Sequence, residues 1–225
     1  MKSLIKRILL EEVELKEQTI VQDIINWFYP LIFDNKLDYE FGCNEESLKN
    51  FSNLKVLYET LVEQGIIDSG DTIALIRGLR QKLYLSDNGT VKKEYLVSTG
   101  AKGFGNVNNS EKTPLGLCYI EKIITTDEKY ESIIGGKETG VVLGPNQDGP
   151  REGHCAEVTT GSMVLSGAEP CNKNVENRFI YIHGTNKEKY LGKAASGGCI
   201  RVSNDDILEL TDILGRGTYV YITKY

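Results

Sequence analysis

The residues with the clearest potential for chemistry are a cysteine and a histidine in the C-terminal part of the chain. Only two histidines occur, His154 and His183, and Cys199 follows Gly197 and Gly198. A thiol reacts as the thiolate, and a neighbouring imidazole lowers its pKa and carries its proton. Glycines let backbone amides approach a substrate carbonyl closely, as an oxyanion site requires. Spacing alone leaves two interpretations open: a nucleophile with its base, or a buried cysteine with an unrelated histidine.

His183 is expected to end a β-strand. In the run 178–183 the side chains alternate, which puts Phe179, Tyr181 and His183 on one face. Gly184 follows, where the chain can turn. The imidazole would then meet a loop arriving from elsewhere, while Tyr181 would form part of the core or one wall of a groove.

A helix is predicted soon after the cysteine. Ser203 can cap it, and Asp205 and Asp206 favour the positive end of the helix dipole. Gly215 supplies a stop, so the helix should span about residues 204–214. The nucleophile would therefore lie just ahead of a fixed element.

The surrounding sequence predicts a mainly antiparallel β domain. Asp87-Asn88-Gly89 is a strong hairpin signal, because Asn and Gly tolerate the positive φ of tight turns. Short apolar runs with glycine and proline between them are typical of strands in such a domain. The runs cover residues 72–76, 82–85, 91–97, 117–124, 140–143, 162–165, 178–183 and 218–222.

Residues 1–70 are predicted to form a helical N-terminal region, separate from a catalytic domain over 71–225. Apolar residues recur at helical spacing from about residue 4 to 33, which indicates two amphipathic helices. A third should begin near Glu45 and end at Gly65. The fold class is therefore expected to be α+β: a mainly antiparallel β sandwich or barrel-like domain with a helical segment that acts as a support or as a docking module.

Composition excludes several classes of protein. The 225 residues are 40% hydrophobic and 26% charged, as in an ordinary globular protein. The 26 basic and 32 acidic residues give a net charge of -6 without a basic stripe, so nucleic acid is a poor candidate partner. No apolar run reaches the roughly twenty residues of a membrane span. The N-terminus shows no secretory signal, because acidic residues interrupt it early.

The other cysteines suggest little chemistry. None of the five forms a CxxC pair. His154 and Cys155 could join Cys171 as three metal ligands, but no zinc spacing accompanies them. We favour a loop near the active-site entrance, with Cys155 buried or incidental, and interpret Cys43 and Cys118 as small core residues.

Two segments, 182–185 (Ile-His-Gly-Thr) and 196–201 (Ser-Gly-Gly-Cys-Ile-Arg), resemble the catalytic signature of the YkuD-type L,D-transpeptidases. The resemblance covers roughly residues 72 to 222 and leaves out the N-terminal third. Upstream segments are similar to the family's first strands, its Thr-Pro-x-Gly turn and its variable loop: 81–85, 95–100, 112–116 and 144–160.

The resemblance implies acyl transfer on peptidoglycan stem peptides, with no metal or other cofactor. Cys199 would attack the carbonyl of the L-centre of the diamino acid at the third stem position, release D-alanine and hold a thioester. An amine of a neighbouring stem would then complete a 3-3 cross-link. His183 would be the general base, the Gly184 carbonyl its orienting partner, and amides near Gly198 and Cys199 the oxyanion site.

Three more motif residues are expected at the site. Ser196 matches a Ser/Thr position and would fix the loop by hydrogen bonding. Arg201 matches the family's arginine two positions after the nucleophile, where it would bind a substrate carboxylate or pair with local acidic residues. Gly197 departs from the family pattern, because it replaces a histidine that would help to line the groove.

Two alternatives follow. Water in place of the amine acceptor would give an L,D-carboxypeptidase, and loss of the histidine at Gly197 could leave a catalytically silent peptidoglycan-binding protein. The resemblance also implies that carbapenems acylate the same cysteine. The expected substrate indicates the cell envelope, in the periplasm or cell wall.

Overall fold

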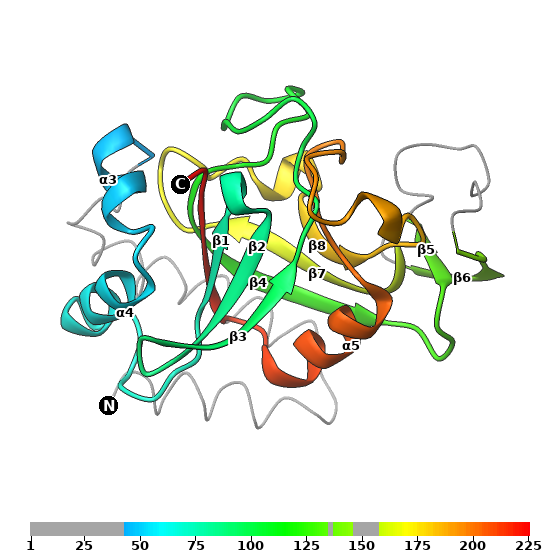
Figure 1. Ribbon diagram of the computed structural model, residues 1–225, viewed down its shortest axis with the longest axis horizontal. Helices are drawn as coiled ribbons and strands as arrows, with labels where there is room; N and C mark the ends of the chain where they lie inside the picture. Colours follow the sequence, from blue (N-terminus) through cyan, green and yellow to red (C-terminus); the bar gives the residue numbers. More distant parts are fainter. Residues whose placement is uncertain (1–42, 135–136, 146–157) are drawn as a thin grey trace, which may run out of the picture.

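The computed structural model describes residues 43–134, 137–145 and 158–225, and it has the α+β architecture expected from the sequence (Figure 1). A mainly antiparallel sheet carries a hydrophobic cluster on each of its faces. The helices predicted between residues 4 and 33, together with His154 and Cys155, lie outside the described residues. Within them, no helix is long and apolar enough to cross a membrane.

The sheet is open rather than closed into a barrel. Its strands follow the order β3-β2-β1-β10-β4-β7-β5-β6, and β8 joins β7 to β9. Only β1 with β10 and β8 with β9 are parallel among the described pairs. The strands are β1 (Ala74–Arg77), β2 (Lys82–Asp87), β3 (Thr90–Leu96), β4 (Gly116–Thr125), β5 (Glu131–Ile134), β6 (Lys137–Val142), β7 (Thr159–Gly167), β8 (Tyr181–Gly184), β9 (Ile200–Val202) and β10 (Tyr219–Thr223).

Most strands lie where the apolar runs predicted them. The β2–β3 hairpin is confirmed, since Asn88 and Gly89 adopt φ values of 50° and 76° in its turn. β5 and β9 were not predicted. β9 has only three residues, which is too short for an alternating pattern to stand out.

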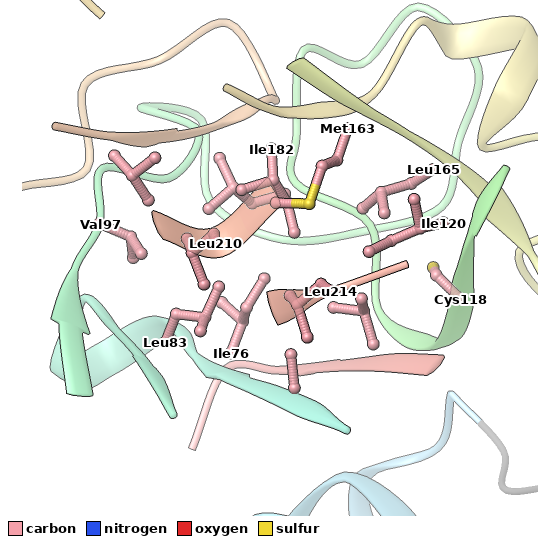
Figure 2. Close-up of a cluster of buried hydrophobic side chains, with 14 of the residues drawn as sticks. Ile76, Leu83, Val97, Cys118, Ile120, Met163, Leu165, Ile182, Leu210 and Leu214 are labelled. Carbon is pink, nitrogen blue, oxygen red and sulfur yellow. The ribbon is translucent and has the colours of Figure 1, made fainter. Parts of the chain in front are cut away.

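Alternation along the central strands fills the main core (Figure 2). Ile76 of β1 and Val220 of β10 point into this cluster, while their neighbours Leu75 and Tyr221 point to the opposite face. Cys118 is fully buried here, as predicted. Because side chains alternate along these strands, the sheet has two apolar faces, and other elements must cover each of them.

Helix α5 (Asn204–Ile213) covers the main core. Its N-terminus is capped as predicted, because the Ser203 hydroxyl accepts the amide of Asp206 at 3.0 Å. Ile207 and Leu210 are buried against the sheet. This packing fixes the chain immediately after β9.

Helices α3 (Glu45–Asn50) and α4 (Leu54–Glu63) pack on the other face. The single helix predicted here is in fact two, because Asn53 interrupts it and caps α4 with its side chain. Leu57 shares a buried cluster with Tyr221 of the sheet. The described part of the N-terminal region is thus packed onto the β domain.

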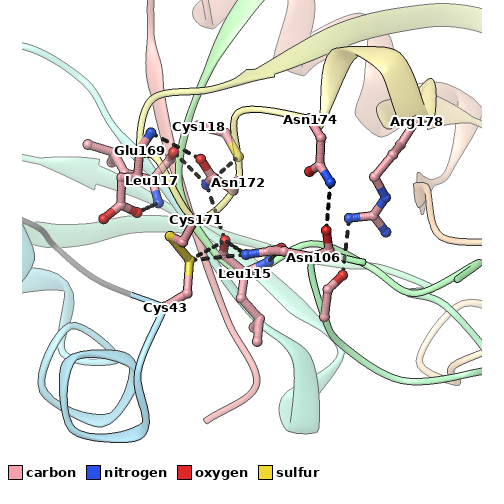
Figure 3. The surroundings of a disulfide bond; sticks show 11 residues. Cys43, Asn106, Leu115, Leu117, Cys118, Glu169, Cys171, Asn172, Asn174 and Arg178 are labelled. Atoms are coloured by element: carbon pink, nitrogen blue, oxygen red, sulfur yellow. Dashed lines mark hydrogen bonds between the residues drawn. A yellow bond between two sulfur atoms is a disulfide. The ribbon is translucent and has the colours of Figure 1, made fainter. Parts of the chain in front are cut away.

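A disulfide also joins the N-terminal region to the loop after β7 (Figure 3). Cys43 and Cys171 are bonded, with their Cα atoms 6.3 Å apart. The interpretation of Cys43 as a core residue is therefore wrong. Its partner lies 128 positions away, so no local pattern could have revealed the bond.

Candidate active site

Parallel pairing brings Cys199 and His183 to neighbouring strands. In the β8–β9 ladder, His183 lies opposite Arg201 and Ile182 opposite Ile200. Paired strands are about 4.8 Å apart, and Cys199 leads directly into β9. Since Cys199 is two positions before Arg201, continued alternation puts its thiol on the face that His183 shares.

Two hydroxyl groups contribute three of the hydrogen bonds that hold the cysteine loop, residues 195–199. The Ser196 hydroxyl donates to the Cys199 carbonyl at 2.5 Å and accepts the Gly198 amide at 3.1 Å, which is the loop-fixing role expected for it. From outside the loop, the Thr113 hydroxyl donates to the Gly198 carbonyl at 2.8 Å. Gly198 itself has φ of 122°, a value that strongly favours glycine.

The Cys199 thiol is half-buried and is not part of a disulfide. Its Sγ donates to the Phe179 carbonyl oxygen at 3.3 Å. Phe179 does not belong to the strand predicted for it. It follows a short 3-10 helix, Glu176–Arg178, adopts φ of 54°, and is 65% exposed, so it is not in one row with Tyr181.

His183 is a buried, neutral imidazole. It is 3% exposed, and its Nδ1 lies 2.8 Å from the Gly184 carbonyl oxygen. A carbonyl only accepts, so Nδ1 carries the hydrogen and Nε2 keeps its lone pair. Burial lowers the pKa of His183 to about 4; the bond to Gly184 opposes this shift, and the charge of Arg201 adds to it.

A bulge in β7 packs closely against Gly184. The β7–β8 register shifts between Thr159 and Ser162, and Thr160 adopts φ of 68°, which is unusual for a β-branched residue. A Cβ added to Gly184 would lie 2.4 Å from the Thr159 carbonyl oxygen. The strand end beside the base therefore accommodates only glycine.

Asn204, at the start of α5, ties this bulge to the strand end. Its Oδ1 accepts the hydroxyls of Thr159, at 2.7 Å, and Thr160. Its Nδ2 donates to the Thr185 carbonyl at 2.7 Å and to Glu188 Oε1 at 2.8 Å. Asn204 is fully buried with every hydrogen-bonding position used, which makes the surroundings of the base rigid.

The other predicted site residues differ in their surroundings. The Arg201 guanidinium donates to the Ala195 carbonyl at 3.5 Å, and its backbone pairs with Ser98. Tyr181 is half-buried at the start of β8. Gly197 is exposed, and a Cβ added there would have no neighbour within 4 Å.

Two residues that the structure brings to the site had no predicted role. Thr113 belongs to the Thr-Pro-Leu-Gly turn, whose sequence gave no sign of a bond to a residue 85 positions away. Arg178 was expected in a strand, but it ends the 3-10 helix next to Phe179. Motif spacing identifies candidate reactive residues more readily than the residues that hold them in place.

One group of possible metal ligands occurs among the described residues. Cys43, Cys171 and Glu169 bring their ligand atoms within 4.8 Å of one another. Both sulfurs are joined in the disulfide. The Glu169 carboxylate instead accepts the Leu117 amide at 2.5 Å. The cluster therefore links loops rather than presenting three available ligands.

Known proteins match most of the β domain. A family model described as the L,D-transpeptidase catalytic domain (YkuD) matches residues 71–222. The YkuD protein of Bacillus licheniformis, named as an L,D-transpeptidase, is 57% identical over 104 residues, which are 46% of this chain and 49% of that protein. ErfK/SrfK of Salmonella typhimurium, named likewise, is 30% identical over 161 residues, which are 68% of this chain and 50% of that protein. The chain thus spans about half the length of these relatives.

Solved structures of L,D-transpeptidases show a weaker likeness. L,D-transpeptidase 3 from Mycobacterium tuberculosis, in complex with a faropenem-derived adduct, has a TM-score of 0.43 at 14% sequence identity. The match covers 68% of this chain and 60% of that one. Likeness at this level supports no conclusion about the site.

Proposed function

The chain belongs to the YkuD family of L,D-transpeptidase catalytic domains, and from this we propose that it forms 3-3 peptidoglycan cross-links through an acyl-enzyme on Cys199. One observation carries the proposal. Nδ1 of His183 is held by the Gly184 carbonyl, so Nε2 is the basic nitrogen, on a strand paired with the one that Cys199 leads into.

The first step is acylation of Cys199 by a stem tetrapeptide. His183 Nε2 takes the thiol proton while Sγ attacks the carbonyl of the L-centre at the third stem position. We place the oxyanion at the backbone amide of Cys199, because the Gly198 amide expected to share this role already donates to the Ser196 hydroxyl. The C–N bond then breaks, His183 returns the proton to the leaving amine, and D-alanine departs from a thioester.

The second step transfers the acyl group to an acceptor. An amine of a neighbouring stem attacks the thioester, His183 takes its proton, and the thiolate leaves as the new amide forms. Water as the acceptor gives a carboxypeptidase by the same proton transfers. A silent peptidoglycan-binding protein would keep the groove and perform neither step.

Arg201 and Tyr181 have supporting roles in this proposal. Arg201 lies opposite His183 in the ladder, where its guanidinium can bind a substrate carboxylate close to the base. Tyr181 forms one wall of the groove at the start of β8. Neither takes part in proton transfer.

The proposed location is the cell envelope, where peptidoglycan lies. The Cys43–Cys171 disulfide supports this location, because such bonds persist mainly in oxidising compartments. Stem peptides would be the partner, and carbapenems would acylate Cys199 in place of the substrate.

Intact mass spectrometry with disaccharide-tetrapeptide tests the proposal. We expect an acyl adduct and released D-alanine with the wild type, and neither with Cys199→Ala. Adding an acceptor stem separates the two enzymatic outcomes, since cross-linked product indicates transfer and free tripeptide indicates hydrolysis. A protein with a titratable Cys199 thiol that forms no adduct with the tetrapeptide or a carbapenem would contradict the enzymatic proposal.

A further inference from the structure

A segment outside the two signature segments, 182–185 and 196–201, reaches Cys199. Residues 168–180, which we call the clasp segment, follow β7 and cross the loop 100–115 (Figure 3). Asn174 Nδ2 donates to the Asn106 carbonyl at 2.7 Å, and Arg178 Nη1 donates to the Gly105 carbonyl at 3.1 Å. The clasp segment therefore fixes the loop from which Thr113 reaches the cysteine loop.

The Arg178 side chain and its neighbour approach Cys199 along two routes. Along the chain, the next residue is Phe179, whose carbonyl accepts the thiol at 3.3 Å. Through space, Arg178 Nη2 donates to the Lys112 carbonyl oxygen, and that oxygen lies 3.2 Å from where a Cβ of Gly198 would be. The guanidinium is thus anchored against the peptide that precedes the nucleophile.

The other titratable and charged groups near the site lie on β8, on β9 and in the loop 100–115. His183 on β8 is neutral near pH 7, because burial keeps its pKa at about 4. On β9, Arg201 lies opposite His183, and its charge helps to lower the pKa of that imidazole. In the loop, Glu111 pairs with Lys102 at 2.8 Å, and Lys112 offers its carbonyl to Arg178.

Arg178 can place a fixed positive charge near Cys199. Its guanidinium remains charged at any pH at which the protein folds. Burial lowers the pKa of Arg178, and the charges of Cys118 and, after it, Cys199 oppose this shift. Electrostatic coupling of two groups is mutual, so the same interaction favours the thiolate of Cys199.

We propose that Arg178 is the positioning residue of the nucleophile and that it stabilises the Cys199 thiolate by its charge. Ionisation moves the thiol proton to His183 or solvent, and the guanidinium balances the new negative charge without changing its own protonation. The inference rests on the proposed function only in taking Cys199 as the nucleophile.

Alkylation of Cys199 by iodoacetamide as a function of pH tests this role on the full chain with its disulfide intact. Peptide mass spectrometry assigns the modified cysteine, and the midpoint of rate against pH gives the thiol pKa. We expect a wild-type midpoint below the ordinary thiol value of about 8.5. Arg178→Met should raise it by about one pH unit, which is roughly a tenfold loss of rate below the midpoint.

Two further variants separate charge from structure. Arg178→Lys keeps the charge and should restore most of the midpoint. Asn174→Ala is the matched control, because it removes two hydrogen bonds from the same segment to the same loop without removing charge. It should leave the midpoint unchanged.

Three results would overturn the proposal: a wild-type midpoint at or above about 8.5, no change in Arg178→Met, or an equal change in Asn174→Ala. If Arg178→Met does not fold, Arg178→Gln, which retains an amide donor, and the wild-type midpoint decide the matter. Alkylation needs no substrate. An enzyme that forms no adduct with stem peptide but retains the Arg178 dependence would contradict the proposed function and leave this inference standing.

Discussion

The proposed base, His183, and the proposed nucleophile, Cys199, are held in different ways. His183 lies in a buried strand, and Gly184 beside it contacts a β-bulge and Asn204 so closely that no side chain fits. Cys199 is half-buried in a loop that is held by separate contacts, including the hydroxyl of Thr113. The position of His183 is thus set by the packing of the sheet. The position of Cys199 depends on separate loop contacts, each of which a single substitution can remove.

This difference has a chemical consequence. A buried imidazole stays neutral and keeps one tautomer, so it is ready to accept a proton. A thiol must meet a large substrate and therefore requires exposure, which leaves its position to loop contacts. Substitutions near His183 should mainly lower the free energy of unfolding. Substitutions near Cys199 should mainly change the reactivity of its thiol.

Gly184→Ala should have the largest effect. The new Cβ would lie 2.4 Å from a backbone oxygen of Thr159, which cannot move without breaking the β7–β8 ladder. We expect a loss of about 4 kcal/mol or more in the free energy of unfolding, measured by urea titration. Gly197→Ala is the control, and it should unfold as the wild type does. A Gly184→Ala protein of wild-type stability would show that the base side is less rigid than described.

The pH dependence of stability should be the next largest effect. Unfolding returns the pKa of His183 from about 4 to its ordinary 6.5, so between these values the unfolded chain binds a proton that the folded chain does not. Stability should therefore fall as pH falls from 6.5 to 4, by about 3 kcal/mol in all, and this contribution should not change above 6.5. Urea unfolding across that range measures it.

His183→Gln separates this contribution from that of the carboxylates. The variant should lose less stability than the wild type between pH 6.5 and 4, since it has no imidazole to protonate. Parallel profiles for the two proteins would mean that His183 is not buried as a neutral group.

Thr113→Val tests the nucleophile side. The substitution keeps the shape of the side chain and removes a hydroxyl that donates to the Gly198 carbonyl and accepts the Gly100 amide. Leaving these buried groups unsatisfied should cost about 2 kcal/mol. The rate of Cys199 alkylation should also change. Thr211→Val, which removes an exposed hydroxyl within α5, should change neither quantity and serves as the control.

Features that depend on nearby residues could be predicted from the sequence. Cys199, His183 and Gly184 were found because short motifs carry them, and the Ser203 cap and the Asn88-Gly89 turn because local conformational preference specifies them. Short apolar runs and the alternation of side chains located most of the strands. These features depend on residues that are close together along the chain.

Long-range contacts explain what was missed. Cys43 pairs with Cys171 across 128 positions, and Thr113 bonds to Gly198 across 85. Phe179 was assigned to a strand because its alternation continues that of β8, yet its left-handed φ ends a 3-10 helix. The sheet was left as a possible barrel because strand patterns do not reveal whether the first and last strands meet.

Gly197→His should have the smallest effect, and it tests the one departure from the family motif. Gly197 is exposed, its backbone lies outside the left-handed region, and no atom stands within 4 Å of a new Cβ. We therefore expect a change of less than about 0.5 kcal/mol in unfolding free energy and an unchanged rate of carbapenem acylation. The thermal midpoint and intact mass spectrometry measure the two quantities. A rate increase of about tenfold, or 1.4 kcal/mol, would mean that a ring here contacts the ligand and that this side of the site is built by side chains as well as by loop backbone.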